Sequence, residues 1–207
     1  MSKRFFTSDF HFGMSVLLNK QIMKCNVRPF ESIEKMNSEI LKMCFNVTTV
    51  DDMIIHLGDL ACYKQDRDLN GLDIKPIELI KQIPATFINI RGNHDINNKV
   101  KSVADSMQLH LGKHFPNVTC GHYPSYDIRS KSYIRSGWIN LCGHVHKKWK
   151  HCLDLDNSIL NINVGVDVWN FKLVSEDELI KYIFHLLTLP KEQLNKIKTI
   201  NGRIVNV

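Results

Sequence analysis

The chain has 207 residues, of which 43% are hydrophobic and 23% are charged, so it falls in the size range of a globular domain with its own core. This composition excludes a disordered tail, a collagen-like repeat and a small disulfide scaffold. The 27 lysines and arginines outnumber the 21 acidic residues, and the formal charge of +6 favours anionic partners such as phosphate-bearing ligands. Because there is no internal repeat or flexible linker, we expect a single domain over residues 1–207, with a helical or extended tail over about 190–207.

Targeting signals and cysteines predict the compartment. The N-terminus has no apolar stretch of the signal-peptide kind, and the most apolar segment, 179–189, is short and contains Lys181 and His185. The six cysteines include no Cys-x-x-Cys pair, which favours buried, reduced thiols over disulfides. We therefore expect a cytoplasmic protein with no membrane partner, and the sequence is silent on its oligomeric state.

Short apolar runs alternate with stretches of helical spacing. The apolar runs predict buried strands at residues 5–6, 53–57, 86–90, 118–120 and 138–142. Helical spacing predicts helices over residues 33–44, 76–83 and 100–111, and a further one from a Ser175–Glu178 capping box to Pro190. Asp156-Asn157 lies between two apolar runs and predicts a hairpin. This alternation favours an α/β sandwich.

A polar cluster stands where each predicted strand should end. The clusters are Ser8-Asp9-Phe10-His11, Gly58-Asp59, Gly92-Asn93-His94-Asp95, Gly121-His122 and Gly143-His144-Val145-His146. Because the carboxyl ends of strands in an open α/β sheet converge on one crevice, these distant residues would meet there. Glycine beside a functional residue lets the backbone turn sharply and approach a ligand closely.

The residue types in these clusters indicate a metal site. Aspartate, asparagine and several imidazoles form a nitrogen and oxygen ligand set that suits divalent transition metals. The set has too few carboxylates for calcium and lacks the thiolates of structural zinc sites. Taken singly, Gly58-Asp59 is ordinarily a turn and the segment from Asp9 to His11 ordinarily a surface loop. The four residues from Gly92 to Asp95 are more specific, because a turn needs no histidine there.

Taken in order, the five clusters resemble the calcineurin-like metallophosphoesterase family, whose pattern is Asp-x-His, Gly-Asp, Gly-Asn-His-Asp/Glu, a later His, and Gly-His-x-His. The flanks Arg28-Pro29-Phe30, Gly121-His122-Tyr123-Pro124 and residues 163–169 resemble a subgroup of small single-domain microbial and viral members, and the likeness spans roughly residues 5–174. Met14 departs from the relatives that share the segment Ser8-Asp9-Phe10-His11-Phe12-Gly13, because they often have histidine after its glycine. The resemblance implies a four-layer αββα sandwich with the metal site at the C-terminal ends of the strands.

The resemblance also implies a cofactor and roles for single residues. The cofactor would be two divalent metal ions, with Mn favoured over Fe, Zn or Ni. One ion would be held by Asp9, His11, Asp59 and His146, and the other by Asp59, Asn93, His122 and His144, so that Asp59 bridges. A metal-bridging hydroxide would attack phosphorus, His94 would protonate the leaving group, and Asp95 would orient the imidazole of His94. Asp167 would support the metal ligands without binding a metal ion itself, and Trp169 would have a packing role.

Two further arginines and one basic stretch are candidates for substrate binding. Arg28 and Arg91 are candidate ligands for phosphate oxygens, with a solvated loop arginine as the alternative for Arg28. Between Tyr126 and Lys150, a charge of +5 comes from Arg129, Lys131, Arg135, Lys147, Lys148 and Lys150 against Asp127. Interleaved aromatic residues are typical of surfaces that bind nucleotides or nucleic acids, although a solvated basic loop is the more frequent interpretation.

Two classes of function follow. The first is a metal-dependent phosphoric ester hydrolase, a phosphatase or phosphodiesterase, whose substrate could be a nucleotide or a nucleic-acid end. The alternative is a non-catalytic metal-binding interaction module on the same fold; the complete ligand set and His94 argue against it. A Cys/His zinc site that includes Cys120, Cys142 and Cys152 is a minor alternative, because the first two lie on strands and are expected to pack inward.

Overall fold

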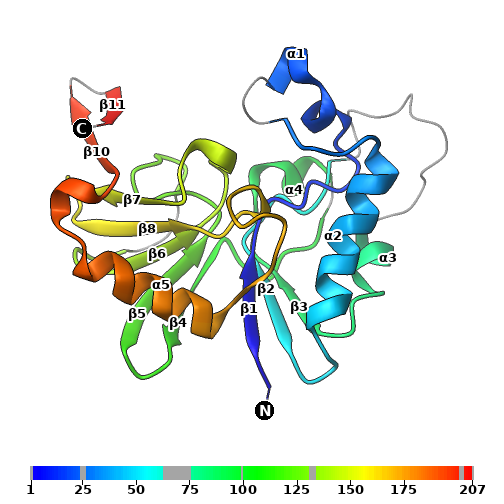
Figure 1. Ribbon diagram of the computed structural model, residues 1–207, viewed down its shortest axis with the longest axis horizontal. Coiled ribbons are helices and arrows are strands. Elements are labelled where there is room, and N and C mark those ends of the chain that lie inside the picture. The colour runs from blue at the N-terminus through cyan, green and yellow to red at the C-terminus, as the bar shows by residue number, and fades with distance from the viewer. Residues whose placement is uncertain are drawn as a thin grey trace.

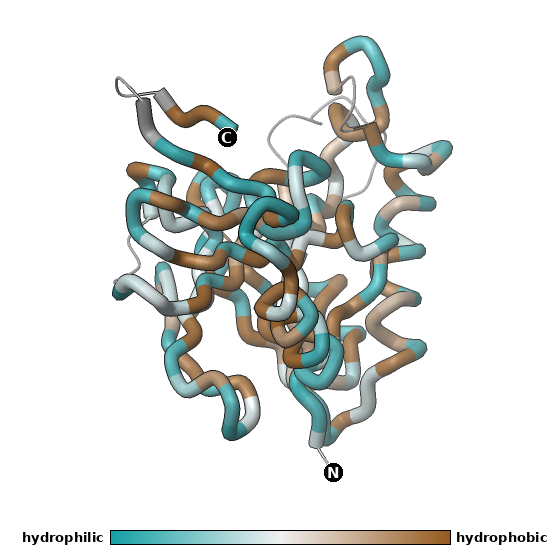
Figure 2. The backbone as a smooth tube through the Cα atoms, turned by 60° about the vertical axis from the view of Figure 1, so that its left-hand side comes forward, coloured by the Kyte–Doolittle hydropathy of each residue, from teal (hydrophilic) through white to brown (hydrophobic). Residues whose placement is uncertain are grey.

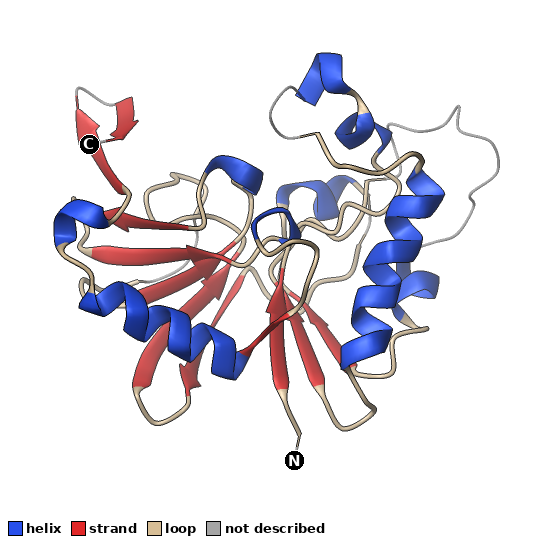
Figure 3. Cartoon of the chain, in the orientation of Figure 1, coloured by secondary structure: helices blue, strands red, loops and turns tan. Residues whose placement is uncertain are grey.

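Two β-sheets pack against each other in the computed structural model, which describes residues 2–23, 27–62, 76–98, 100–130, 134–200 and 203–206 (Figures 1 and 3). The prediction of an α/β fold built on two sheets with flanking helices is confirmed. Residues of both sheets share one hydrophobic cluster, which contains Phe6 and Ile55 from one sheet and Leu141 and Ile162 from the other. Figure 2 shows hydrophobic and hydrophilic residues interleaved along the elements, as expected when each is buried on one side.

The smaller sheet has four strands in the order β3-β2-β1-β9. They are β1 (Arg4–Thr7), β2 (Met53–His56), β3 (Thr86–Asn89) and β9 (Val174–Ser175). The first three run parallel, with Thr7 opposite His56 and His56 opposite Asn89, whereas β9 is antiparallel to β1. The segments that follow β1, β2 and β3 therefore start at the same edge of the sheet and at the same level.

The larger sheet has seven strands in the order β11-β10-β7-β8-β6-β5-β4. They are β4 (Ser106–Leu111), β5 (Phe115–Gly121), β6 (Ile139–Cys142), β7 (His151–Asp154), β8 (Ile159–Asn163), β10 (Lys196–Ile200) and β11 (Arg203–Asn206). The central strands β5, β6 and β8 are parallel, and β7 and β8 form the predicted antiparallel hairpin. In Figure 1, the carboxyl ends of these central strands and of β1 to β3 converge near the middle of the molecule.

Helices cover the smaller sheet and close the shared core. On α2 (Ile33–Val47), which Ser32 caps, Met36, Ile40 and Cys44 are buried in one cluster with Phe5 and Ile54. The helix α5 (Glu176–Thr188) starts at the predicted capping box and contributes buried leucine and isoleucine side chains to the cluster between the sheets. The shorter helices are η1 (Ser15–Leu18), α1 (Lys20–Met23), α3 (Pro76–Ile80), α4 (Asn93–Asn97), η3 (His146–Lys148), η4 (Val166–Val168) and η5 (Lys191–Gln193).

The predicted helix over 100–111 is wrong. Residues 106–111 form β4, which pairs antiparallel with β5. Met107, Leu109 and Leu111 alternate with exposed Gln108 and His110, a period of two that suits a strand with one buried face. The apolar residues of this segment also fit a helical period, but hydrogen bonding to β5 makes it a strand.

Two other expectations concern the thiols and the tail. Five buried cysteines, at positions 44, 62, 120, 142 and 152, are in no disulfide, as predicted; Cys25 lies outside the described residues. The segment after Pro190 contains η5 and the strands β10 and β11, so it includes the extended structure expected there. Among the residues that the structure describes, no helix is both long and apolar enough to cross a membrane.

Candidate metal centre

The loops after the central strands have an unusual backbone at the predicted ligands. Of the eight non-glycine residues with positive φ in the described part of the chain, five are predicted ligands: Asp9 (61°), His11 (51°), Asp59 (58°), His144 (70°) and His146 (49°). A non-glycine residue in this region costs about 1–3 kcal/mol, and such residues cluster at functional sites. The left-handed residues turn each loop back across the end of its strand, which brings the side chains together.

Glycines let these loops approach one another closely. A Cβ on Gly143 would clash with the side chains of Ser8 and Asp9, and a Cβ on Gly92 would clash with Asp59. The close approach allows the backbone N–H of His144 to donate to both carboxylate oxygens of Asp9, at 3.2 and 3.1 Å. The loops after β1 and β6, which lie 135 residues apart in sequence, are thereby joined at the centre.

The first group of side chains contains Asp9, His11 and His146, whose potential ligand atoms all lie within 4.8 Å of one another. His11 is buried and stacks on His146 with ring centroids 5.1 Å apart. Neither ring nitrogen of His11 has a hydrogen-bond partner within the described structure, which is costly for a buried polar group. Burial lowers the pKa of His11 even though Asp9 and Asp59 raise it, so the ring is neutral and offers a lone pair. These residues fit a cation.

The second group contains Asp59, His122 and His144. Nδ1 of His122 lies 2.8 Å from the carbonyl oxygen of Leu57, a contact in which Nδ1–H donates. Nε2 then lies 3.2 Å from Oδ2 of Asp59 and 3.1 Å from Oδ1 of Asn93. Since Oδ2 of Asp59 is also 3.7 Å from Nε2 of His11, one carboxylate oxygen lies between the two groups. The structure therefore brings together all seven predicted ligands.

Charge at this centre favours bound cations. Burial lowers the pKa of His122, but the carboxylates of Asp59 and Asp9 outweigh it and raise that pKa to about 9. Burial raises the pKa of Asp59, yet His122 and His11 hold it well below its ordinary value. The carboxylates thus create a negative field that stabilises positive charge in a desolvated position. The alternative Cys/His zinc site gains no support, since the potential ligand groups among the described residues contain no cysteine.

His94 lies beside the centre, whereas the predicted role of Asp95 is wrong. The backbone N–H of His94 donates to Oδ1 of Asp59 at 2.8 Å, and its ring is edge-on to His11. The buried Asp95 carboxylate instead accepts hydrogen bonds from the backbone N–H groups of Asp59, Leu60 and Gly92. Asp95 therefore holds the loop that carries Asp59 and does not orient the imidazole of His94.

Cys62 is the residue that faces the imidazole, and sequence reasoning missed it. Its Sγ lies 3.6 Å from Nδ1 of His94. Cys62 is buried just after the Gly58-Asp59 cluster, where the backbone N–H of Cys62 donates to the carbonyl oxygen of Phe12. No motif marks this cysteine, so only the fold could place it.

The expectation that Arg28 binds phosphate is also wrong. Its side chain is buried, and its N–H groups donate to Asp167 (3.0 Å from both Nε and Nη2), to the carbonyl oxygens of Phe10 and Asp9, and to Sδ of Met36. These contacts use all five donors of the guanidinium. Arg28 is thus a structural residue beneath the Asp9 loop.

Asp167 connects this buried arginine to a predicted ligand. Its Oδ2 lies 2.8 Å from Nδ1 of His146. Burial raises the pKa of Asp167, but Arg28 and His146 outweigh it and lower that pKa to about 2. Asn163 supports the same loop by donating to the carbonyl oxygen of His146. The supporting role expected of Asp167 matches this contact, and the indole of Trp169 packs on Tyr182 as expected.

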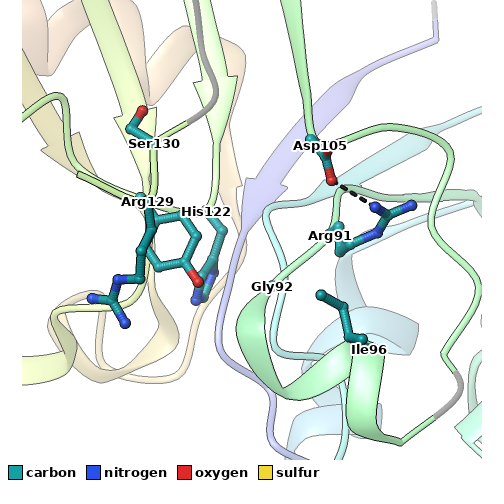
Figure 4. A pocket seen from close by; sticks show the side chains of 8 residues that line it. Arg91, Gly92, Ile96, Asp105, His122, Arg129 and Ser130 are labelled. Atoms are coloured by element: carbon teal, nitrogen blue, oxygen red, sulfur yellow. Dashed lines mark ion pairs between the residues drawn. The ribbon is translucent and has the colours of Figure 1, made fainter. Parts of the chain in front are cut away.

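Arg91, in contrast, lines a pocket of about 260 Å³ that opens beside His122. Figure 4 shows Arg91, Asp105 and Ile96 on one side and His122, Arg129 and Ser130 on the other. Nη1 of Arg91 lies 2.9 Å from Oδ1 of Asp105, and 41% of the arginine side chain is exposed. The pocket therefore presents guanidinium groups next to the second group of ligands.

The basic stretch does not form one surface. Arg129 lines the pocket, whereas Lys147 donates to the carbonyl oxygen of Val27 and Nζ of Lys150 lies 3.5 Å from the centre of the Trp169 ring. Arg135 is exposed near Trp138. Lys131 and Tyr133 lie outside the described residues.

Comparisons with known proteins agree with this arrangement. Residues 3–197 match the calcineurin-like phosphoesterase family, whose members are in general metal-binding hydrolases of phosphoesters. An uncharacterised protein of Methanocaldococcus jannaschii is 31% identical over 185 residues, which cover 88% of this chain and 92% of that protein. The crystal structure of a protein of unknown function from Aquifex aeolicus has the same fold, with a TM-score of 0.64, 23% identity, and coverage of 88% of this chain and 100% of that chain.

A more distant likeness is the crystal structure of nuclease MPE from Pseudomonas putida, with a TM-score of 0.42, 14% identity, and coverage of 99% of this chain and 87% of that one. The match to the family pattern extends from the start of β1 into β10 and includes every loop of the candidate metal centre. The chain belongs to the calcineurin-like phosphoesterase family.

Proposed function

We propose that this protein is a phosphoesterase that uses two divalent cations, with Mn²⁺ favoured, to hydrolyse phosphomonoester or phosphodiester bonds. The observation that carries the proposal is the position of the Asp59 carboxylate, which lies 3.7 Å from Nε2 of His11 and 3.2 Å from Nε2 of His122. A carboxylate between two groups of imidazoles is the arrangement that a two-cation site needs.

Each cation would have its own set of protein ligands. Asp9, His11, Asp59 and His146 would hold one, and Asp59, Asn93, His122 and His144 would hold the other. The bound cations would polarise the phosphate and activate a water molecule as nucleophile. The unpaired ring nitrogens of His11 and the mixed nitrogen and oxygen donors support this fit.

Supporting contacts fix which nitrogen of each imidazole faces the centre. His122 uses Nδ1 to donate to the carbonyl oxygen of Leu57, and His146 uses Nδ1 to contact Asp167. In both rings Nε2 is then the nitrogen available as a ligand. Such supporting partners raise the basicity of the ligand and hold the ring in place.

His94 is the proposed general acid. It stands at the start of α4, beside but outside the two proposed ligand sets, with its ring edge-on to His11 at a centroid distance of 5.2 Å. From this position it would donate a proton to the leaving oxygen of the ester. Cys62 contacts Nδ1, which leaves Nε2 as the nitrogen that donates.

The substrate would enter through the pocket beside His122, where the exposed side chain of Arg91 would meet its phosphate oxygens. A nucleotide or a nucleic-acid end is the proposed class, because the pocket combines guanidinium groups with the ring of Tyr123. The five buried cysteines that form no disulfide suit the reducing conditions of the cytoplasm, which we propose as the compartment.

The test is a panel of aryl phosphate, bis-aryl phosphate, and 2′,3′- and 3′,5′-cyclic nucleotides, each assayed with Mn, Ni, Zn, Fe and Mg added separately. We expect turnover that depends on the added cation and that Asp59→Asn abolishes. If the protein binds cations but turns over none of these esters, the non-catalytic interaction module is the better description.

A further inference from the structure

The guanidinium of Arg129 joins the substrate pocket to the candidate metal centre. Its Nη2 lies 2.7 Å from Nε2 of His144, and its Cζ lies 4.6 Å from the centre of the Tyr123 ring. On its remaining side, Nε and Nη2 donate to the carboxylate of Asp127 at 2.9 and 2.6 Å. Figure 4 shows Arg129 next to His122 on one wall of the pocket. Three neighbours thus hold a guanidinium at the edge of the second ligand group.

The contact with Arg129 occupies one ring nitrogen of His144, a proposed ligand of the second cation. A guanidinium can only donate, so Nε2 of His144 accepts the hydrogen bond from Arg129 with its lone pair. A lone pair serves one partner at a time. A cation held through Nε2 of His144 would therefore compete with the guanidinium for this lone pair.

A phosphate ester is the ligand that would let both positive groups remain at the site. Guanidinium groups bind phosphate through paired, charge-assisted hydrogen bonds, and a phosphate bound to the second cation would lie within reach of Arg129. The arginine side chain is 51% exposed and lines the pocket, so it can turn from His144 toward a ligand there. On one face the guanidinium lies over the ring of Tyr123, a cation–π contact that leaves its edge available for hydrogen bonds.

We propose that Arg129 binds the phosphate group of the substrate. When it does so, its guanidinium leaves His144 and frees this imidazole for the second cation, so that binding of phosphate and binding of the second cation are coupled. The inference rests on the proposed two-cation phosphoesterase and names the residue that selects phosphate at that site. It predicts that Arg129→Ala raises the affinity for the second cation and lowers the affinity for phosphate.

Arg129→Ala removes both the competitor for His144 and one positive charge, so the second cation binds several-fold more tightly. The same change removes the hydrogen bonds to phosphate, and the affinity for phosphate falls roughly 10- to 100-fold, the size expected for one or two hydrogen bonds to a charged group. A merely structural arginine would weaken both affinities, and a residue without a role would change neither.

The experiment is titration calorimetry on the 207-residue chain, first with Mn²⁺ alone and then with inorganic phosphate at saturating Mn²⁺. Wild type, Arg129→Ala and Arg129→Lys are compared with Arg135→Ala, which removes an exposed charge from the same stretch. Arg129→Lys keeps the charge but loses the planar fork, so its phosphate affinity should lie between those of wild type and Arg129→Ala. Arg135→Ala should match wild type in both titrations.

The outcomes separate this inference from the function on which it rests. If wild type binds neither Mn²⁺ nor phosphate, both are overturned. If wild type binds about two Mn²⁺ and phosphate, but Arg129→Ala binds them with unchanged affinity or binds both more weakly, the phosphoesterase proposal stands and the role of Arg129 is wrong.

Discussion

Oδ2 of Asp167 lies 2.8 Å from Nδ1 of His146, so a buried carboxylate fixes this imidazole from behind and leaves Nε2 as its free ligand atom. The same carboxylate forms a bidentate ion pair with Arg28, whose guanidinium also donates to the carbonyl oxygens of Phe10 and Asp9. The candidate metal centre is thus anchored to the interior of the protein through one buried ion pair.

Asp167→Asn should lower the affinity for the first cation by roughly 10- to 100-fold, the usual effect of removing a supporting partner of a ligating histidine. The asparagine amide carries no charge, so it raises the basicity of the His146 imidazole less than the Asp167 carboxylate does. Mn²⁺ titration would measure the change, with Asp52→Asn as the control because Asp52 is a buried aspartate that binds backbone and side-chain donors at Lys3 and Thr49. A variant that binds Mn²⁺ as tightly as wild type would show that Asp167 does not support a ligand.

Arg28→Met should cost about 3–5 kcal/mol in the free energy of unfolding, because it removes the guanidinium that pairs with the buried carboxylate of Asp167. Arg91→Met should cost about 1 kcal/mol at most, since its pair with Asp105 is exposed, but it should raise KM for a phosphate ester. Urea denaturation and steady-state kinetics measure the two effects. Similar losses of stability in both variants would contradict the structural role given to Arg28.

Much of the centre could be predicted from the sequence because each ligand either follows a glycine or lies two residues from another ligand, at the end of an apolar run. Asp9, Asp59 and His122 are examples, and parallel strands bring such ends together whatever their separation in the chain. The strands themselves were predictable for the same reason, since their apolar runs are short and bounded by turn residues.

Partners that depend on tertiary packing could not be predicted. Arg28 and Asp167 are 139 residues apart, and nothing near Arg28 in the sequence distinguishes a buried ion pair from a phosphate ligand. The family resemblance implied a contact between Asp95 and the ring of His94, yet the first turn of α4 directs the Asp95 carboxylate to the backbone of the Asp59 loop. In β4, apolar residues fit both a helical and a strand period, and only the pairing with β5 decides.

His94→Ala should keep its cations but lower kcat by roughly 10²- to 10⁴-fold, the usual contribution of a general acid. The loss should be smaller for nitrophenyl esters, because nitrophenolate leaves with little protonation. Paired measurements of kcat and bound Mn²⁺ across a series of leaving groups would test both statements. Loss of Mn²⁺ from the variant would instead identify His94 as a ligand.

Asp59→Asn should cause a larger loss of bound cations than Asp9→Asn. The Asp59 carboxylate lies near both His11 and His122, whereas Asp9 belongs to the first group. Elemental analysis of the purified variants would give the stoichiometry, with about one Mn²⁺ expected for Asp9→Asn and fewer for Asp59→Asn. Identical cation content in the two variants would place the bridge elsewhere.

The central claim is a pair of cations that share Asp59, and anomalous diffraction from crystals grown with Mn²⁺ tests it most directly. The account predicts two Mn peaks about 3.5–4 Å apart, as in other two-metal sites. One peak should contact Asp9, His11 and His146, the other His122, His144 and Asn93, and both should contact the carboxylate of Asp59. A single peak, or two peaks with no contact to Asp59, would contradict it.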